Sequence, residues 1–369
     1  MTGYAGDNIV ISVFLQSLPG PTANFQSTLF MVDEAQGTGN GLDGDRYRSY
    51  GTTADLDADE ALGYISAEVK QAGYDYFAQP GRKKTLLIGR MDSVGGEAYD
   101  TAYDLVIAAG ANFYGVAADT RTPADQVLMY DAVEADDFLL FVFQSSDADW
   151  LTGGGFPVAY TSFSGVERTA ILYHDTDTEW SDLAWLGRIL EFDPDNQSAP
   201  WSNYLGNVLA YTSTPDASEK SNAQDNNANL GLALGSKTFW IDRGVTGEGS
   251  GTTEGRPIDH IVSVDWFVKR LEEDLINFKI QKADIGEKIP VNAIGQKMIL
   301  GLIEKRLEQG ISAGHFQPQL PTDDTVRTEA EARTIITADI TNKRLRFRVQ
   351  VVWVTGAIEF IVDVYARAA

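Results

Sequence analysis

Residues that could perform chemistry are few and widely spaced in this sequence. The three histidines are His174, His260 and His315, and none has the HExxH spacing of a zinc site. The chain has no cysteine, which excludes a thiolate metal site, a disulfide framework and a cysteine nucleophile. We expect no serine nucleophile elbow. The sequence therefore predicts a protein that is not an enzyme and that has no cofactor and no bound metal.

Three glycine-rich or acidic stretches have the composition of ligand-binding loops without their spacing. No Gly-Lys-Ser/Thr follows GTGNG, Gly37–Gly41, so it is not a phosphate loop. The acids of DLDADE, Asp55–Glu60, lack the glycine and the terminal glutamate of a calcium loop. The triplet Gly153–Gly155 lacks the spacing of a dinucleotide loop. We interpret the first two stretches as solvated turns within a loop-like region, residues 33–63.

The charge of the chain is concentrated in its first 260 residues. They hold 14 basic and 38 acidic residues, whereas residues 261–369 hold 15 of each, so the whole net charge of −24 lies in the first part. An acidic surface argues against nucleic acid as a partner, because phosphate binding requires a basic one. No apolar run approaches the roughly 20 residues that a membrane span needs. A length of 369 residues predicts two domains.

The stretch Gly255–Gly310 has the pattern of two amphipathic helices joined by a linker that ends at Pro290. Apolar residues of the first helix recur at three- and four-residue steps: Ile261, Val264, Val268, Leu271, Leu275 and Phe278. The second helix is predicted to run from Asn292 to Gly310, with an apolar arc so wide that it needs neighbours on several sides. These neighbours belong either to its own domain or to a partner subunit.

Short apolar strands alternate with helices from about Glu60 to Phe192. The predicted strands are Thr85–Gly89, Phe113–Ala117, Phe138–Gln144 and Ala170–His174, and the predicted helices are Asp59–Phe77, Glu97–Ala109, Pro123–Ala135 and Glu179–Leu190. This alternation indicates an α/β layer with a largely parallel sheet. No glycine-rich fingerprint follows these strands. Residues 193–258 are turn-rich and polar, and two stretches in them are predicted to be exposed connections: DNNAN, Asp225–Asn229, and GVTGEGSGTTEG, Gly244–Gly255.

Both ends of the chain have the alternation of β-strands. In the N-terminal strand, Asn8–Gln16, the residues on one face are Ile9, Ile11, Val13 and Leu15. The C-terminal stretch predicts a hairpin, Arg344–Val354 and Ile358–Tyr365, and Phe360, Val362 and Val364 lie on one face of its second strand. The N-terminal strand is either an edge strand of its own sheet or an arm that adds to the sheet of a neighbour.

The tract Ala67–Asp104 resembles a family of contractile tail sheath proteins of bacteriophages. Members have a helix that ends in a Tyr-Phe pair, then a glutamine near a proline, a basic patch and a strand that ends in Gly-Arg; here these are Tyr76-Phe77, Gln79, Arg82–Lys84 and Gly89-Arg90. Further similar blocks are Glu167–Asp175, Ile258–Leu275 and Glu287–Ile299. The series spans roughly residues 8–312, and no block is a catalytic signature.

The resemblance implies a structural subunit of a myovirus-type sheath in the virion, synthesised in the host cytoplasm. Sheath proteins stack as hexameric rings around a tail tube and contract to drive the tube through the host envelope. The implied fold is an outer α/β domain with a mixed, largely parallel sheet, residues 29–235, and an inner α+β domain, residues 236–369. The inner domain includes the C-terminal hairpin and the N-terminal arm, residues 1–28.

Assembly contacts follow from the same resemblance. The arms exchange strands between subunits, and the second amphipathic helix faces the tube with Lys297, Lys305 and Arg306 as candidate contacts. Implied partners are further copies of the chain, the tube protein, and baseplate and tail terminator proteins, with no nucleic acid and no direct membrane contact. Two alternatives stay open: a shell protein that self-assembles without contracting, and a flavodoxin-like ligand-binding or enzymatic α/β protein.

Overall fold

The chain divides into two compact units. The computed structural model describes residues 8–14, 23–33, 41–81, 85–136, 138–163, 165–247, 255–290, 293–316, 333–339, 344–353 and 356–365. Unit 1 comprises residues 1–23, 194–198 and 262–369, and unit 2 comprises residues 24–193 and 199–261. Unit 2 has 14 basic and 36 acidic residues, a net charge of −22, whereas unit 1 has 15 and 17, a net charge of −2.

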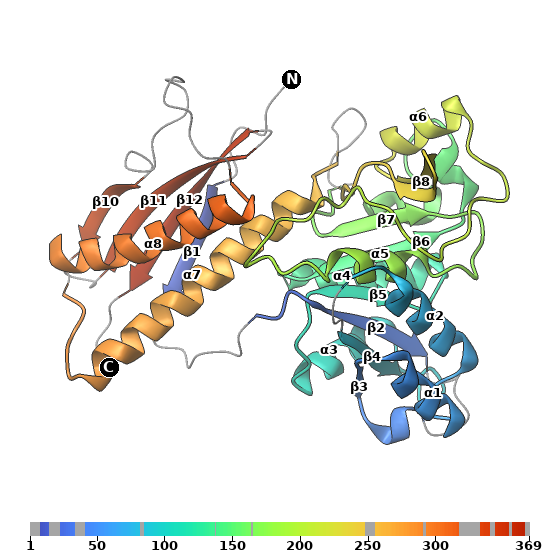
Figure 1. The fold of residues 1–369 in the computed structure, drawn as a ribbon, viewed down its shortest axis with the longest axis horizontal. Helices are drawn as coiled ribbons and strands as arrows, with labels where there is room; N and C mark the ends of the chain where they lie inside the picture. Colours follow the sequence, from blue (N-terminus) through green and yellow to red (C-terminus); the bar gives the residue numbers. More distant parts are fainter. Residues whose placement is uncertain are drawn as a thin grey trace. The chain divides into compact units, whose positions relative to one another are not determined.

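Unit 2 is built on an eight-stranded sheet in the order β3-β4-β2-β5-β6-β7-β8-β9 (Figure 1). Its six central strands are parallel: β2 (Ser27–Asp33), β4 (Thr85–Met91), β5 (Gly115–Ala118), β6 (Leu140–Ser145), β7 (Thr169–Tyr173) and β8 (Asn229–Leu234). The edge strands β3 (Tyr47–Tyr50) and β9 (Lys237–Ile241) are antiparallel to their neighbours. The prediction of an α/β layer with a largely parallel sheet is confirmed.

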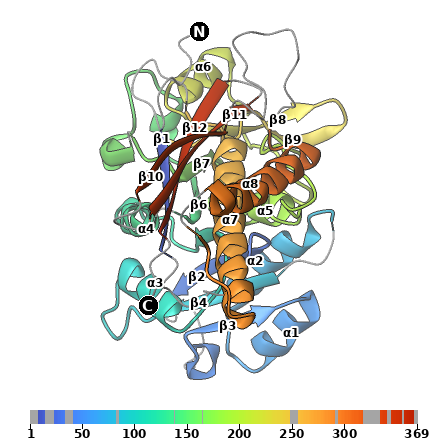
Figure 2. The ribbon, with the colours of Figure 1, turned by 90° about the vertical axis from the view of Figure 1, so that its left-hand side faces the viewer.

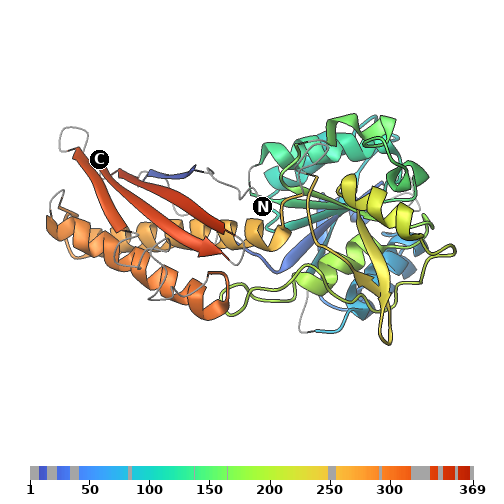
Figure 3. The same cartoon turned by 90° about the horizontal axis from the view of Figure 1, so that it is seen from above.

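Helices cover both faces of this sheet, which explains why its central strands are continuous apolar runs rather than alternating ones. Helices α3 (Tyr99–Ala108) and α4 (Pro123–Ala135) lie on one face, and α2 (Ala67–Ala78) and α5 (Ser181–Ile189) lie on the other (Figures 1 and 3). Every residue of β5, β6 and β7 is buried. Helices α1 (Thr53–Ala61) and α6 (Ala217–Asp225) and the short helices η2 (Gly41–Gly44), η3 (Ala148–Leu151) and η4 (Val158–Phe163) complete the unit.

Two sequence predictions for unit 2 are wrong at the level of local structure. The single helix predicted over Asp59–Phe77 is two helices, because Gly63 takes a left-handed φ of 75° and Ser66 caps α2 by accepting a hydrogen bond from Val69 N at 3.2 Å. The region 33–63 is not all loop, since it contains η2, β3 and α1. The acids of DLDADE lie in α1, whose start is fixed by a reciprocal cap between Thr52 and Asp55.

Unit 1 combines two long helices with a four-stranded sheet. The helices are α7 (Ile258–Asp284), whose first turn belongs to unit 2, and α8 (Ala293–Ala313), which crosses α7 (Figure 2). The sheet has the order β1-β12-β11-β10 and lies along one side of the helices (Figure 3). Its strands are β1 (Asn8–Phe14), β10 (Arg333–Asp339), β11 (Arg344–Trp353) and β12 (Gly356–Tyr365). Strand β11 pairs antiparallel with both β10 and β12, and β1 pairs parallel with β12.

The second helix of the pair ends later than the sequence pattern indicates. Helix α8 continues through Gly310 and ends near Gly314, which takes a left-handed φ of 83°. The predicted first residue of this helix, Asn292, lies outside the described residues. In α7, Ile261, Leu271 and Leu275 are buried as the periodicity predicts, and Trp266 and Phe267 join them at 0% exposure. No helix in the described ranges has both the length and the apolarity needed to cross a membrane.

Candidate functional site

The carboxyl ends of the parallel strands in unit 2 are the place where α/β folds usually bind ligands. The chain passes from β2 to β4 on one side and then returns to β5 on the other, so the topological switch point lies at β2. Beside it, Arg121 Nη1 donates to Asp182 Oδ2 at 2.8 Å, and the Arg121 guanidinium lies 4.6 Å from the ring centre of Trp180. Asp182 is completely buried. These side chains are thus engaged with one another at this edge of the sheet.

A second polar group lies at the same edge of the sheet. Asp119, directly after β5, accepts hydrogen bonds from the Tyr99 hydroxyl and, at 3.0 Å, from the Asp33 backbone N–H. Burial raises the pKa of Asp119 to about 6 against the opposing effect of these hydrogen bonds. The carboxylates of Asp119 and Asp182 thus accept hydrogen bonds from other groups of the chain. Because these polar groups pair with one another and not with a ligand, the arrangement disfavours the flavodoxin-like alternative. In the parts of the chain that the structure describes, no three His, Asp or Glu side chains are arranged to hold a metal ion.

One serine does have the GxSxG spacing, in GISAG, Gly310–Gly314. A nucleophile elbow places its serine on a tight turn between a strand and a helix. Ser312 instead lies in the last turn of α8 and is exposed. The geometry is that of a helix end and not of an elbow.

The three histidines do not form a site either. His174 is fully buried at the end of β7, where its ring nitrogens contact Leu209 O and Thr176 N, both at 3.1 Å. His315 stacks on Trp266 with ring centres 4.6 Å apart, and its Nε2 lies 2.6 Å from Pro194 O. Burial lowers the pKa of His260, and the neighbouring Asp259 opposes this effect. We interpret His174 and His315 as structural.

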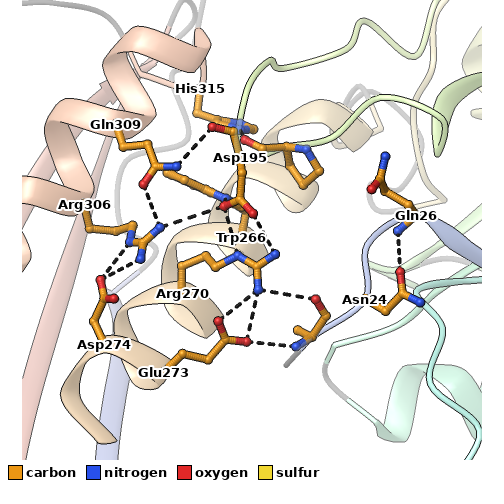
Figure 4. Close-up of polar contacts among 12 residues, drawn as sticks. Asn24, Gln26, Asp195, Trp266, Arg270, Glu273, Asp274, Arg306, Gln309 and His315 are labelled. Carbon is orange, nitrogen blue, oxygen red and sulfur yellow. Dashed lines mark hydrogen bonds and ion pairs between the residues drawn. The ribbon is translucent and has the colours of Figure 1, made fainter. Parts of the chain in front are cut away.

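A polar network in the described part of unit 1 joins the segment Pro194–Ser198 to the helix pair (Figure 4). Asp195 accepts hydrogen bonds from Trp266 Nε1 at 2.8 Å and from Arg270 Nε and Nη2 at 3.0 and 2.9 Å. Gln309 Nε2 donates to Asp195 O at 3.1 Å. Burial would raise the pKa of Asp195, but the hydrogen bonds from Arg270 and Trp266 outweigh burial and hold this pKa below its ordinary value.

The same network changes the interpretation of Arg306. Its guanidinium donates to Asp274 Oδ2 from Nη2 at 2.7 Å and from Nε at 3.0 Å, and the residue is only 8% exposed (Figure 4). Arg306 therefore forms an ion pair inside unit 1, and its side chain is not available for the tube contact that the sequence suggested. Lys297 and Lys305 are both exposed. Of the three candidate tube contacts, only these two lysines lie on the accessible face of α8.

Local sequence patterns do not indicate the partners of α7 in this network. Trp266 and Arg270 are one helical turn apart, which indicates a shared face. Their partner Asp195 lies in residues 193–258, which are turn-rich and polar. A contact across 75 residues cannot be inferred from local spacing.

The structure brings the predicted arm residues of the two termini into register. Ile9, Ile11 and Val13 of β1 pair with Phe360, Val362 and Val364 of β12, respectively. Leu15 lies outside the described residues. Both outer strands of the sheet, β1 and β10, have a strand neighbour on one side only among the described residues. An edge of this kind is where another strand can add.

Comparisons with known proteins bear on the fold. No protein-family model matches the sequence, and no curated protein matches it. The sheath tail protein of Listeria innocua has a similar structure, with a TM-score of 0.61 and 10% sequence identity over 93% of this chain and 96% of that chain. The helical sheath protein of the anti-feeding prophage in its contracted state has a TM-score of 0.60 and 12% identity over 96% of each chain.

The chain has the fold of contractile tail sheath proteins. A further sheath-fold structure is that of the PVC sheath complex in its contracted state, from an extracellular contractile injection system. Its TM-score is 0.51, with 14% identity over 90% of each chain. The sheath fold extends over both units of the present chain, because the similarity to the Listeria protein covers nearly all of either chain.

Proposed function

We propose that this protein is a non-enzymatic structural subunit of a contractile tail sheath. The observation that carries the proposal is the end-to-end similarity to the Listeria sheath tail protein, 93% of this chain with 96% of that one. In the proposed role the subunits stack as hexameric rings around a tail tube in a virion. Contraction of the sheath drives the tube through the host envelope, and the ends of the sheath meet baseplate and terminator proteins.

Strand exchange between the termini is the proposed link between subunits. In the single chain, β1 pairs with β12 through residues Asn8–Phe14. Replacing β1 with the same strand of a neighbouring subunit would keep every backbone hydrogen bond of this ladder. Each such bond stabilises by roughly 0.5–1.5 kcal/mol, while ordering an arm costs about 1–2 kcal/mol per residue. One arm alone would therefore bind weakly, and a closed mesh of arms would assemble cooperatively.

The charge difference between the units supports a division of roles. Unit 2, with a net charge of −22, is proposed to form the outer, solvated layer of the sheath, since net charge of one sign keeps surfaces from sticking together. Unit 1, with a net charge of −2, can pack against copies of itself with little repulsion. Lys297 and Lys305 on the exposed face of α8 are proposed to face the tube.

Electron microscopy of the purified protein tests the proposal directly. Long tubes with sixfold symmetry are the expected result. Flat lattices would favour the alternative of a shell protein that self-assembles without contracting, and single particles under all conditions would contradict both.

A further inference from the structure

The hairpin of β8 and β9 extends beyond the packed part of the sheet in unit 2. Its residues Ala233–Thr238 are all exposed, whereas Phe239 and Ile241 at its base are buried. The base is also covered along its edge, because Leu205 N donates to Phe239 O at 3.0 Å and Ile241 N donates to Asn203 O at 2.9 Å. The tip lies beyond this cover. A two-stranded ribbon gains little stability by itself in water, so the fold of unit 2 gives no reason for the extension.

The tip of this hairpin has an apolar and a basic residue in paired positions. Leu234 is 56% exposed, and Lys237, its partner across the hairpin, is exposed as well. Lys237 is the only charged residue between Asn229 and Ile241. Its Nζ lies 4.0 Å from the ring centre of Tyr204, and among the described residues it forms no ion pair. A surface that fits this tip offers an apolar side chain and a carboxylate.

Helix α1 has this combination on its outer face. Leu62, the residue at its C-terminal cap, is 64% exposed. The Asp57 side chain accepts a hydrogen bond from the Tyr74 hydroxyl and is still 54% exposed. The exposed residues Ala58 and Ala61 lie at steps of three and four from these two positions, so all four residues share one face. The small alanine side chains leave room for the side chain of a partner.

The two surfaces lie at opposite edges of unit 2. The order of strands in its sheet begins with β3, which α1 follows in the chain, and ends with β9 (Figure 2). A contact between two different surfaces of this kind is heterologous, and it links each copy to the next instead of closing a dimer. Repetition of the contact gives a ring or a helical chain of copies.

We propose that the hairpin tip of one copy docks on α1 of the next copy, with Leu234 against Leu62 and Lys237 paired with Asp57. The charges are complementary, because residues 41–70 around α1 hold seven acidic and three basic residues, a net charge of −4. This inference rests on the proposed sheath function, which brings the copies together, and it adds a contact between the acidic units to the strand exchange of unit 1. A contact of this small size is weak alone, so it stabilises the polymer and not a free dimer.

The absence of cysteine makes disulfide cross-linking a direct test. In the variant Leu62→Cys/Leu234→Cys, oxidation of purified tubes should give a ladder of dimers, trimers and longer chains on a non-reducing gel. A disulfide requires Cα atoms about 4.4–6.8 Å apart, so it forms only where the two surfaces meet. Val158→Cys/Leu234→Cys is the matched control, because Val158 is 86% exposed in unit 2, and it should give no ladder. No ladder from the first variant in extended or contracted tubes would overturn the proposal, as would dimers from Leu234→Cys alone, which indicate a symmetric contact.

Charge reversal tests the ion pair. Lys237→Glu should raise the subunit concentration at which tubes form at least about threefold and leave the melting temperature within a few degrees of wild type, because the residue is exposed. Adding Asp57→Lys to the same chain reverses both charges and should return this concentration to within about twofold of wild type. No effect of Lys237→Glu, or no recovery in the double variant, would overturn this inference alone. Failure of the wild-type protein to form tubes would instead overturn the sheath function and this inference with it.

Discussion

Arg270 and Asp195 are 75 residues apart in the sequence, yet two parallel hydrogen bonds of 3.0 and 2.9 Å join their side chains. This is the fork geometry that arginine forms with a carboxylate. Through it, a five-residue segment that interrupts the sequence of unit 2 becomes part of unit 1. The pair therefore has a structural role that can be measured.

Asp195→Ala should destabilise unit 1 by about 2–3 kcal/mol, because it leaves the largely buried Arg270 guanidinium without this partner. The estimate lies below that for a fully buried pair, since the Asp195 side chain is 31% exposed. Urea unfolding followed by circular dichroism measures the change. Gln197→Ala, an exposed position in the same segment, should change the stability by less than about 0.5 kcal/mol. Equal effects of the two substitutions would contradict the role of the pair.

Asp75 should make unit 2 less stable as the pH rises. Burial raises the pKa of Asp75 to about 6, against hydrogen bonds from Asn207 and Gln71. A raised folded-state pKa gives stability that is fully present below the ordinary value of 3.8 and is lost as the pH rises through about 6. Asp75→Asn should therefore stabilise the protein by on the order of 1–3 kcal/mol at pH 8 and change little at pH 4.

Melting temperatures of wild type and Asp75→Asn between pH 4 and pH 8 provide the measurement. Asp104→Asn is the matched control, because Asp104 is exposed and its substitution makes the same change in charge. A pH-independent difference between wild type and Asp75→Asn would refute the assignment.

Asn229 should be among the least replaceable residues of unit 2. Its Nδ2 donates to Ile171 O and Val245 O, both at 2.8 Å, and its Oδ1 accepts from the backbone N–H groups of Gly244 and Val245, both at 2.9 Å. Asn229→Ala leaves these buried backbone groups unpaired, at an expected cost of about 3–5 kcal/mol. Ser221→Ala, an exposed position in α6, is the control and should cost less than about 0.5 kcal/mol in the same denaturant titration.

Deletion of residues 1–17 should separate folding from assembly. If β1 is exchanged between subunits, the truncated chain stays a folded monomer, with a melting temperature near that of wild type, and forms no tubes. Size-exclusion chromatography, thermal melts and electron microscopy together measure the result. A large drop in melting temperature would show that β1 is needed within its own subunit, and normal tubes would show that the arm is not needed at all.

Local sequence patterns predict the elements of unit 2 better than their connections. Helix α4 has the predicted bounds, Pro123–Ala135, because Pro123 at the first turn marks its start. Local patterns do not predict strand β2, since a short buried run such as STLFMVD has no alternation. The composition of DNNAN predicts an exposed connection, yet Asn226, Asn227 and Asn229 are buried and hydrogen-bonded to the backbone of distant segments. Such partners depend on the tertiary fold, which composition does not encode.

The pairing of Asn8 with Glu359 joins two strands, β1 and β12, that the ribosome synthesises at widely different times. The strands of unit 2, β2 to β9, lie between residues 27 and 241, so its sheet can form while the rest of the chain is still on the ribosome. The partner of β1 is β12, which is synthesised after every other strand that the structure describes. At about 5–20 residues per second, β1 waits roughly 20–70 s for β12 of its own chain. During synthesis the first strand is exposed without this partner, and the β12 strands of finished neighbours are the competing templates for it.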